Sequence, residues 1–140
     1  RRVLFRFESF REQPFSEERL RVRSIVFDPR TARTIYLGTS SGFFRSLDGG
    51  TTWEQRGGGM PLHTDASVII VNDLVPDEIY LADDLRGTIY ISTDRGTNWE
   101  GLDLSRLPSP LIRAFSIDPF DPKRVYLGTI SGGVYVMNRR

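Results

Sequence analysis

Short apolar segments recur along the chain between residues 22 and 138, and clusters of Asp, Pro, Gly or Ser bound each of them. The segments are rich in Val, Ile, Tyr and Phe, which favour β-strands, whereas the bounding residues favour turns. No stretch of ten or more residues shows the apolar spacing of an amphipathic helix. The pattern therefore predicts an all-β fold made of short antiparallel strands.

The apolar segments form three repeats. Tyr36, Tyr80 and Tyr126 lie in TIYLGT, EIYLAD and RVYLGT, spaced 44 and 46 residues apart. Upstream of these tyrosines come VRSIVFDP, SVIIVNDL and IRAFSIDP, and downstream come GFFRS, TIYIS and GVYVM. The first two repeats continue with a fourth segment, TTWEQR or TNWEGL. A period of about 40 to 50 residues with four strands per unit indicates the blades of a β-propeller.

A nine-residue motif ends the third strand of the first two repeats: SLDGGTTWE at 46–54 and STDRGTNWE at 92–100. It predicts a hairpin turn, because glycine tolerates positive φ and the aspartate can accept backbone N–H groups. Its tryptophan is expected to pack between neighbouring blades. The residues expected to be structural are Ser46, Asp48, Gly50, Thr52, Trp53, Ser92, Asp94, Gly96, Asn98 and Trp99.

Both motifs resemble the Asp-box of BNR-repeat β-propellers, Ser/Thr-x-Asp-x-Gly-x-Thr-Trp, with Asn98 replacing the threonine of the second. The third repeat departs from the pattern, since Met137 and Arg139 stand at the serine and aspartate positions. Proteins with similar repeats include sortilin-type receptors, photosystem II assembly-factor propellers, xyloglucanases and sialidases. The resemblance implies a propeller, and the catalytic residues of the enzymes cannot be assigned from it, although Asp83 or Asp84 would be first guesses for a xyloglucanase acid.

The repeats divide the chain into four parts. They are a leading segment with one outer strand (1–21), a blade with an Asp-box (22–62), a second such blade (63–108) and an incomplete third blade without a box (109–140). About three blades are too few for a ring, which needs roughly 4 to 8. We therefore expect either part of a larger propeller, which the missing initial methionine favours, or self-association of two copies that closes a ring.

Composition narrows the choice of function. A formal net charge of +1 gives no support for nucleic-acid binding, and no apolar run approaches the roughly 20 residues that span a bilayer. The absence of cysteine excludes disulfides and cysteine-based zinc sites. We expect no metal and no cofactor, and contact with a membrane only through a partner.

Candidate ligand-binding residues lie in the second blade, where the turn between the second and third strands departs from the other repeats. The first and third repeats have small residues there, but the second has Asp83, Asp84 and Arg86. These residues could contact a polar ligand or cation, or supply half of a carboxylate acid/base pair. The alternative is a solvated loop with an Asp84–Arg86 surface pair. The preceding connector adds His63, the only histidine, and Asp65, which could form a base or could be solvated.

These patterns favour a non-catalytic binding or scaffold module for a protein or glycan partner, because no catalytic constellation is assembled. One alternative is a fragment of a carbohydrate-active glycoside hydrolase, in which two carboxylates flank a sugar bond. Another is an assembly factor of a membrane complex, by analogy with the photosystem-type relatives. The same resemblance implies an extracytoplasmic location, which could be secreted, periplasmic or lumenal.

Overall fold

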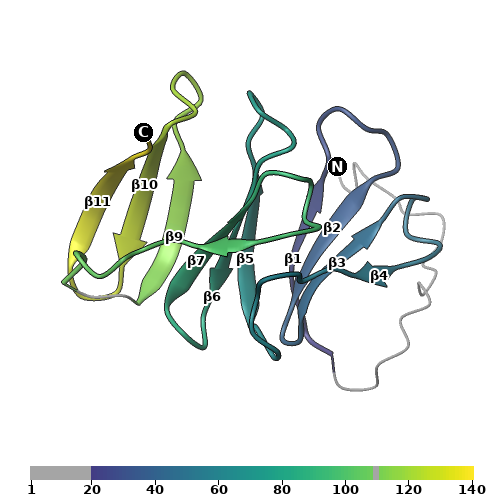
Figure 1. The fold of residues 1–140 in the computed structure, drawn as a ribbon, viewed down its shortest axis with the longest axis horizontal. Coiled ribbons are helices and arrows are strands. Elements are labelled where there is room, and N and C mark those ends of the chain that lie inside the picture. The colour runs from purple at the N-terminus through teal and green to yellow at the C-terminus, as the bar shows by residue number, and fades with distance from the viewer. Residues whose placement is uncertain (1–19, 109–110) are drawn as a thin grey trace, which may run out of the picture.

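The computed structural model describes residues 20–108 and 111–140. Within them, eleven strands form three antiparallel sheets that stand one after another along the molecule, and no helix is present (Figure 1). The prediction of an all-β fold made of propeller blades is confirmed. The strand expected at residues 3–7 lies outside the described residues.

Each sheet is a meander in which every strand pairs with the next one in the chain. Blade 1 contains β1 (Val22–Phe27), β2 (Ile35–Thr39), β3 (Gly42–Ser46) and β4 (Glu54–Gln55). Blade 2 contains β5 (Ala66–Val71), β6 (Ile79–Asp83), β7 (Thr88–Ser92) and β8 (Glu100–Gly101). Blade 3 contains β9 (Ile112–Ile117), β10 (Arg124–Thr129) and β11 (Gly133–Asn138).

The strand register repeats from blade to blade. Ser46 of β3 pairs with Ile35, and Ser92 of β7 pairs with Ile79. In blade 3 the same position is taken by Met137, which pairs with Val125. An irregularity in the pairing of the first two strands also recurs near the start of β1, β5 and β9. Positions that match in the sequence therefore match in space.

The fourth strands are shorter than the sequence predicts, since β4 and β8 have two residues each. The reason lies in the preceding turn, where the backbone N–H of Thr52 donates to the Asp48 carboxylate (2.8 Å). The chain therefore joins β3 only from Glu54 onward, and its last link is the Arg56 N–H on the Phe43 carbonyl (3.0 Å).

The blades pack face to face through apolar layers. Between blades 1 and 2, Tyr36 and Phe43 meet Ile69, Leu81 and Trp99 in one buried cluster. The rings of Phe43 and Trp99 meet edge to face, with centroids 4.9 Å apart. Burial of such large side chains is the main stabilising contribution between blades. Trp99 thus occupies the interblade position expected for it.

Trp53 has a different neighbourhood from Trp99. It is half-buried and lines an apolar cavity of about 400 Å³ with Val22, Ile25 and Leu37. These residues lie on the face of blade 1 that points away from blade 2. A second apolar layer, which includes Tyr80, Ile89, Phe115 and Leu127, joins blades 2 and 3.

Candidate functional site

The Asp-box turns are organised by one serine and one aspartate each. In the first box, the Ser46 hydroxyl donates to Asp48 (2.8 Å) and accepts the Gly50 N–H (2.8 Å). The Asp48 carboxylate accepts both the N–H (2.8 Å) and the hydroxyl (2.5 Å) of Thr52. These hydrogen bonds, those from Thr52 above all, lower the pKa of Asp48 to about 2. The carboxylate is therefore committed to the turn.

The second box keeps this arrangement although Asn98 replaces the threonine. The side-chain amide of Asn98 donates to Asp94 (2.8 Å), as the Thr52 hydroxyl does to Asp48. Burial raises the pKa of Asp94, but the hydrogen bonds from Asn98 and Ser92 outweigh it, so the net pKa lies below the usual value. Substitution of the threonine thus leaves the function of the turn unchanged.

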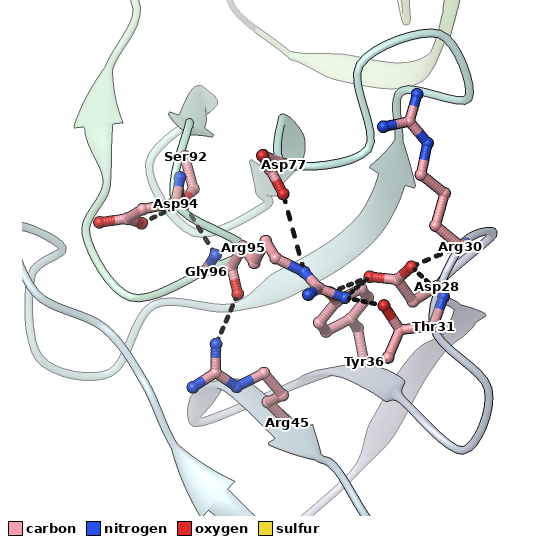
Figure 2. Close-up of polar contacts among 10 residues, drawn as sticks. All are labelled: Asp28, Arg30, Thr31, Tyr36, Arg45, Asp77, Ser92, Asp94, Arg95 and Gly96. Atoms are coloured by element: carbon pink, nitrogen blue, oxygen red, sulfur yellow. Dashed lines mark hydrogen bonds and ion pairs between the residues drawn. The ribbon is translucent and has the colours of Figure 1, made fainter.

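The second box also connects two blades, through Arg95. Its guanidinium crosses from blade 2 to blade 1 and donates to the Asp28 carboxylate (2.5 Å) and to the Thr31 hydroxyl (2.6 Å), as Figure 2 shows. The Tyr36 hydroxyl donates to the same oxygen of Asp28 (2.7 Å). We call Asp28, Tyr36 and Arg95 the Asp28 contact.

Asp28 is fully buried, and its second oxygen accepts the backbone N–H groups of Arg30 and Thr31 (both 2.9 Å). Burial raises the pKa of Asp28, but the hydrogen bonds from Tyr36, Arg95 and the two amides outweigh it and leave the pKa below its usual value. A buried carboxylate with this many donors is stable as an anion. The Asp28 contact therefore joins the blades and offers no free oxygen to a ligand.

A related contact joins blades 2 and 3 with different residues. Asn72 stands at the position of Asp28, and its amide donates to Glu78 (3.1 Å). Arg139 pairs with Glu78 and donates to the Tyr80 hydroxyl (3.0 Å). Sequence reasoning missed both interblade contacts. The available signal was an acidic or amide residue eight positions before the tyrosine in every repeat.

The candidate residues of the second blade lie at the opposite ends of the strands, where β6 turns into β7. Asp83 is fully buried, and its carboxylate accepts the N–H groups of Asp65 (3.2 Å) and Leu85 (3.0 Å). Arg86 pairs with Asp83 (3.0 Å) rather than with Asp84. Asp83 and Arg86 therefore shape the turn.

Asp84 faces the other two blades. Its Oδ2 accepts a hydrogen bond from Arg23 of β1 (2.8 Å) and another from Arg113 of β9 (3.3 Å). Arg23 also lies 3.5 Å from the carboxylate of Asp65. Because β5 lies next to both β1 and β9, Arg23 from blade 1 and Arg113 from blade 3 both reach Asp84 at the β6–β7 turn of blade 2. We call Arg23, Asp65, Asp84 and Arg113 the Asp84 cluster.

The Asp84 cluster is open to solvent. The side chain of Arg113 is 62% exposed, and those of Arg23 and Asp84 are 31% and 25% exposed. Each guanidinium has five N–H donors in a planar fork, so one shared carboxylate leaves most donors available. Asp65 and Asp84 were candidates from the sequence, but Arg23 and Arg113 were not. Arg23 lies 42 residues before Asp65, and Arg113 lies 29 residues after Asp84.

His63 lies apart from these ion pairs. It is exposed, has a positive φ of 59°, and lines a shallow cavity of about 170 Å³ with Gln55, Arg56 and Met60. Asp65 faces Arg23 instead. Within residues 20–108 and 111–140, no three His, Asp or Glu side chains gather closely enough to hold a metal ion.

Two four-stranded meanders with Asp-box turns and a three-stranded meander, stacked one after another, define the class as a β-propeller of the BNR-repeat type. The chain belongs to the photosynthesis system II assembly factor YCF48 family, whose model matches residues 9–139. A comparison with curated proteins gave no match.

Solved structures support the same fold. YCF48 from Cyanidioschyzon merolae is 25% identical with a TM-score of 0.72, over 91% of this chain and 36% of that protein. A structure of YCF48 bound to D1 peptide is 19% identical with a TM-score of 0.65, over 84% of this chain and 36% of that protein. An ancestral GH74 enzyme is 19% identical with a TM-score of 0.67, over 84% of this chain and 17% of that enzyme. The chain thus spans about a third of the YCF48 structures that it matches.

Proposed function

We propose that this chain is part of a protein-binding propeller and that the Asp84 cluster contacts the partner. The observation behind the proposal is that two exposed arginines from different blades share a single carboxylate. A carboxylate of an extended protein segment can replace water on the free donors of Arg23 and Arg113, and bidentate pairs of this kind are strong and directional. The related YCF48 structure with a bound D1 peptide supports a protein as the partner class.

The test is binding of a synthetic D1 peptide to the chain, measured by titration calorimetry. Arg113→Gln should weaken binding about tenfold or more, because charge-assisted hydrogen bonds contribute about 1.5 to 3 kcal/mol. Arg30→Gln is the matched control, since Arg30 is exposed and lies near the opposite ends of the strands. Binding should also weaken with added salt. Equal losses in the two variants, or no binding by the unaltered chain, would contradict the proposal.

The hydrolase alternative has weaker support. Similarity to the GH74 enzymes extends to the fold, and the buried Asp83 is held by backbone N–H groups and Arg86. An acid/base pair needs an accessible carboxylate on each side of the sugar bond. Xyloglucan hydrolysis that disappears in Asp84→Asn would revive this alternative and refute a purely binding role.

We also propose an extracytoplasmic location beside a membrane complex, with the membrane reached through the protein partner. Membership of a photosystem II assembly-factor family supports this setting. The described residues include no helical stretch with the length and hydropathy to cross a bilayer. Cell fractionation checks the location: recovery with the cytoplasmic fraction would contradict it.

Further blades, from a longer chain or from a second copy, are proposed to cover the two outer faces of the three-blade arc. Ile25 on β1 and Val134 on β11 are 62% and 74% exposed. Exposed apolar strands of this kind are sites of association. Light scattering on the 140-residue chain should show a dimer or larger species, and a folded monomer of 16.0 kDa would contradict the proposal.

A further inference from the structure

The turn between the second and third strands is tied to the residue before the first strand in the same way in all three blades. A backbone N–H of the turn donates to the carbonyl of that residue. The donor and acceptor residues are Ser40 and Arg21 (2.9 Å) in blade 1, Asp84 and Asp65 (3.0 Å) in blade 2, and Ile130 and Leu111 (3.0 Å) in blade 3. The three pairs occupy equivalent places, but only the pair of blade 3 is aliphatic.

The aliphatic pair of blade 3 is exposed beside the Asp84 cluster. Ile130 is 53% exposed and Leu111 is 49% exposed. Between them and blade 2 lies a hollow of about 50 Å³, lined by Asp84, Gly87, Leu111, Ile112, Arg113 and Ile130. Two members of the Asp84 cluster thus form part of its wall. The hollow, which we call the Ile130 hollow, is therefore continuous with the cluster.

The Ile130 hollow has the size of a small aliphatic group. Its volume of about 50 Å³ exceeds the roughly 10 to 15 Å³ that one water molecule needs, and it is well below that of a cavity of about 150 Å³ that holds benzene. Leu111, Ile112 and Ile130 provide branched apolar walls, and Gly87 has no side chain to narrow the space. Size and lining therefore favour a side chain such as valine over an aromatic ring.

An extended segment can pair with the Asp84 cluster and fill the Ile130 hollow at the same time. Side chains two residues apart in a strand point to the same side and lie about 7 Å apart. Arg113 lies at the boundary, because it is 62% exposed, donates to Asp84 and also lines the hollow. A carboxylate on its free donors brings the side chain two residues away within reach of Ile130.

We propose, on the basis of the binding role proposed above for the Asp84 cluster, that its partner presents an extended segment with an acidic residue and a small branched aliphatic residue two positions away. The carboxylate pairs with Arg23 and Arg113, and the aliphatic side chain enters the Ile130 hollow. Blade 3 thereby selects the second side chain, since the equivalent residues of the other blades are polar or charged.

Four acetylated and amidated peptides test the proposal on the 140-residue chain: GVSDSVG, GSSDSSG, GFSDSFG and GVSNSVG. Valine on both sides of the aspartate makes the test independent of the direction in which the peptide lies. NMR titrations that follow the methyl groups of Ile130 and Leu111 measure the affinities. GVSDSVG should bind about fivefold more tightly than GSSDSSG, because the valine side chain leaves water. It should also bind more tightly than GFSDSFG, because a phenyl ring does not fit the hollow.

The peptides also distinguish failure of the Ile130 hollow from failure of the Asp84 cluster. Equal affinity of GVSDSVG and GSSDSSG, or tighter binding of GFSDSFG, would overturn the aliphatic selection and leave the carboxylate contact in place. Equal affinity of GVSDSVG and GVSNSVG, or no binding of any peptide, would overturn the carboxylate contact and the selection that depends on it.

Ile130→Ser removes one wall of the hollow and should abolish the preference for GVSDSVG while leaving the affinity for GSSDSSG unchanged. Leu74→Ser is the matched control, because Leu74 is 47% exposed and lies between β5 and β6, at the opposite ends of the strands. If Ile130→Ser unfolds, Leu111→Ser removes the facing wall instead. A preference that survives in the folded hollow variant, or that is lost equally in Leu74→Ser, would overturn the proposal.

Discussion

The Asp28 contact and the Asp84 cluster use the same chemistry in opposite surroundings. In both, a carboxylate of one blade meets an arginine of another. Asp28 is fully buried and takes hydrogen bonds from Tyr36, Arg95 and two backbone amides, whereas Asp84 is 25% exposed between two solvated arginines. We expect loss of a partner to cost more in the buried contact than in the exposed one, because an exposed group that loses its partner is solvated by water.

The largest difference is expected when each carboxylate is removed. Asp28→Ala leaves the Tyr36 hydroxyl buried without its acceptor and should lower the free energy of unfolding by about 3 to 5 kcal/mol. Asp84→Ala should lower it by less than about 1 kcal/mol, because its partners become solvated. Urea unfolding followed by tryptophan fluorescence measures both. Similar losses for the two variants would show that burial does not distinguish them.

Two glycine substitutions distinguish the cost of crowding at the Asp-box from the cost of backbone strain alone. Gly96 has a φ of 87°, and a Cβ there would lie 2.3 Å from the Phe43 ring. Gly133 has a φ of 85° with nothing within 4 Å of its Cβ position. Gly96→Ala should cost about 2 to 4 kcal/mol, and Gly133→Ala about 1 to 2 kcal/mol. Thermal unfolding at equal concentration compares them, and equal shifts would argue against tight interblade packing.

Alkaline pH tests the tyrosines of the two interblade contacts. Burial raises the pKa of Tyr36 and of Tyr80 to about 12, from the usual 10. The unfolded chain therefore loses these protons first, so the stability present below pH 10 should decline as the pH rises from 10 to 12. Tyr36→Phe should cost about 1 kcal/mol at neutral pH and reduce the alkaline decline. An unchanged pH profile in this variant would exclude Tyr36 as the titrating group.

The smallest effect is expected from the partly exposed Asp48 at acid pH. Its folded pKa of about 2 lies below the usual 3.8, so its contribution to stability is present above pH 3.8 and should be lost as the pH falls toward 2. Thr52→Val removes the strongest donor and should reduce this loss while leaving the alkaline decline unchanged. Unfolding curves at acid pH measure this loss of stability. A larger loss in the variant than in the unaltered chain would contradict the prediction.

Much of the fold could be predicted from the sequence because it depends on local patterns. The strand segments and the Asp-box turn each occupy fewer than ten consecutive residues, and three copies established the register. The short β4 was not predicted, since the hydrogen bond from Thr52 to Asp48 delays pairing with β3. The partner of Arg86 was not predicted either: the turn places Asp83, not Asp84, under its guanidinium.

The sequence by itself determined the repeat, the strand class and the turns, because alternation of apolar residues and the φ tolerance of glycine act over a few residues. Only the tertiary structure decided which charges meet. Arg95 lies 67 residues from Asp28, and Arg23 lies 61 residues from Asp84. Such pairs depend on how one blade packs against the next. That packing is set by the apolar layers around Phe43 and Trp99, and the charged side chains then pair with the partners that the packed blades bring within reach.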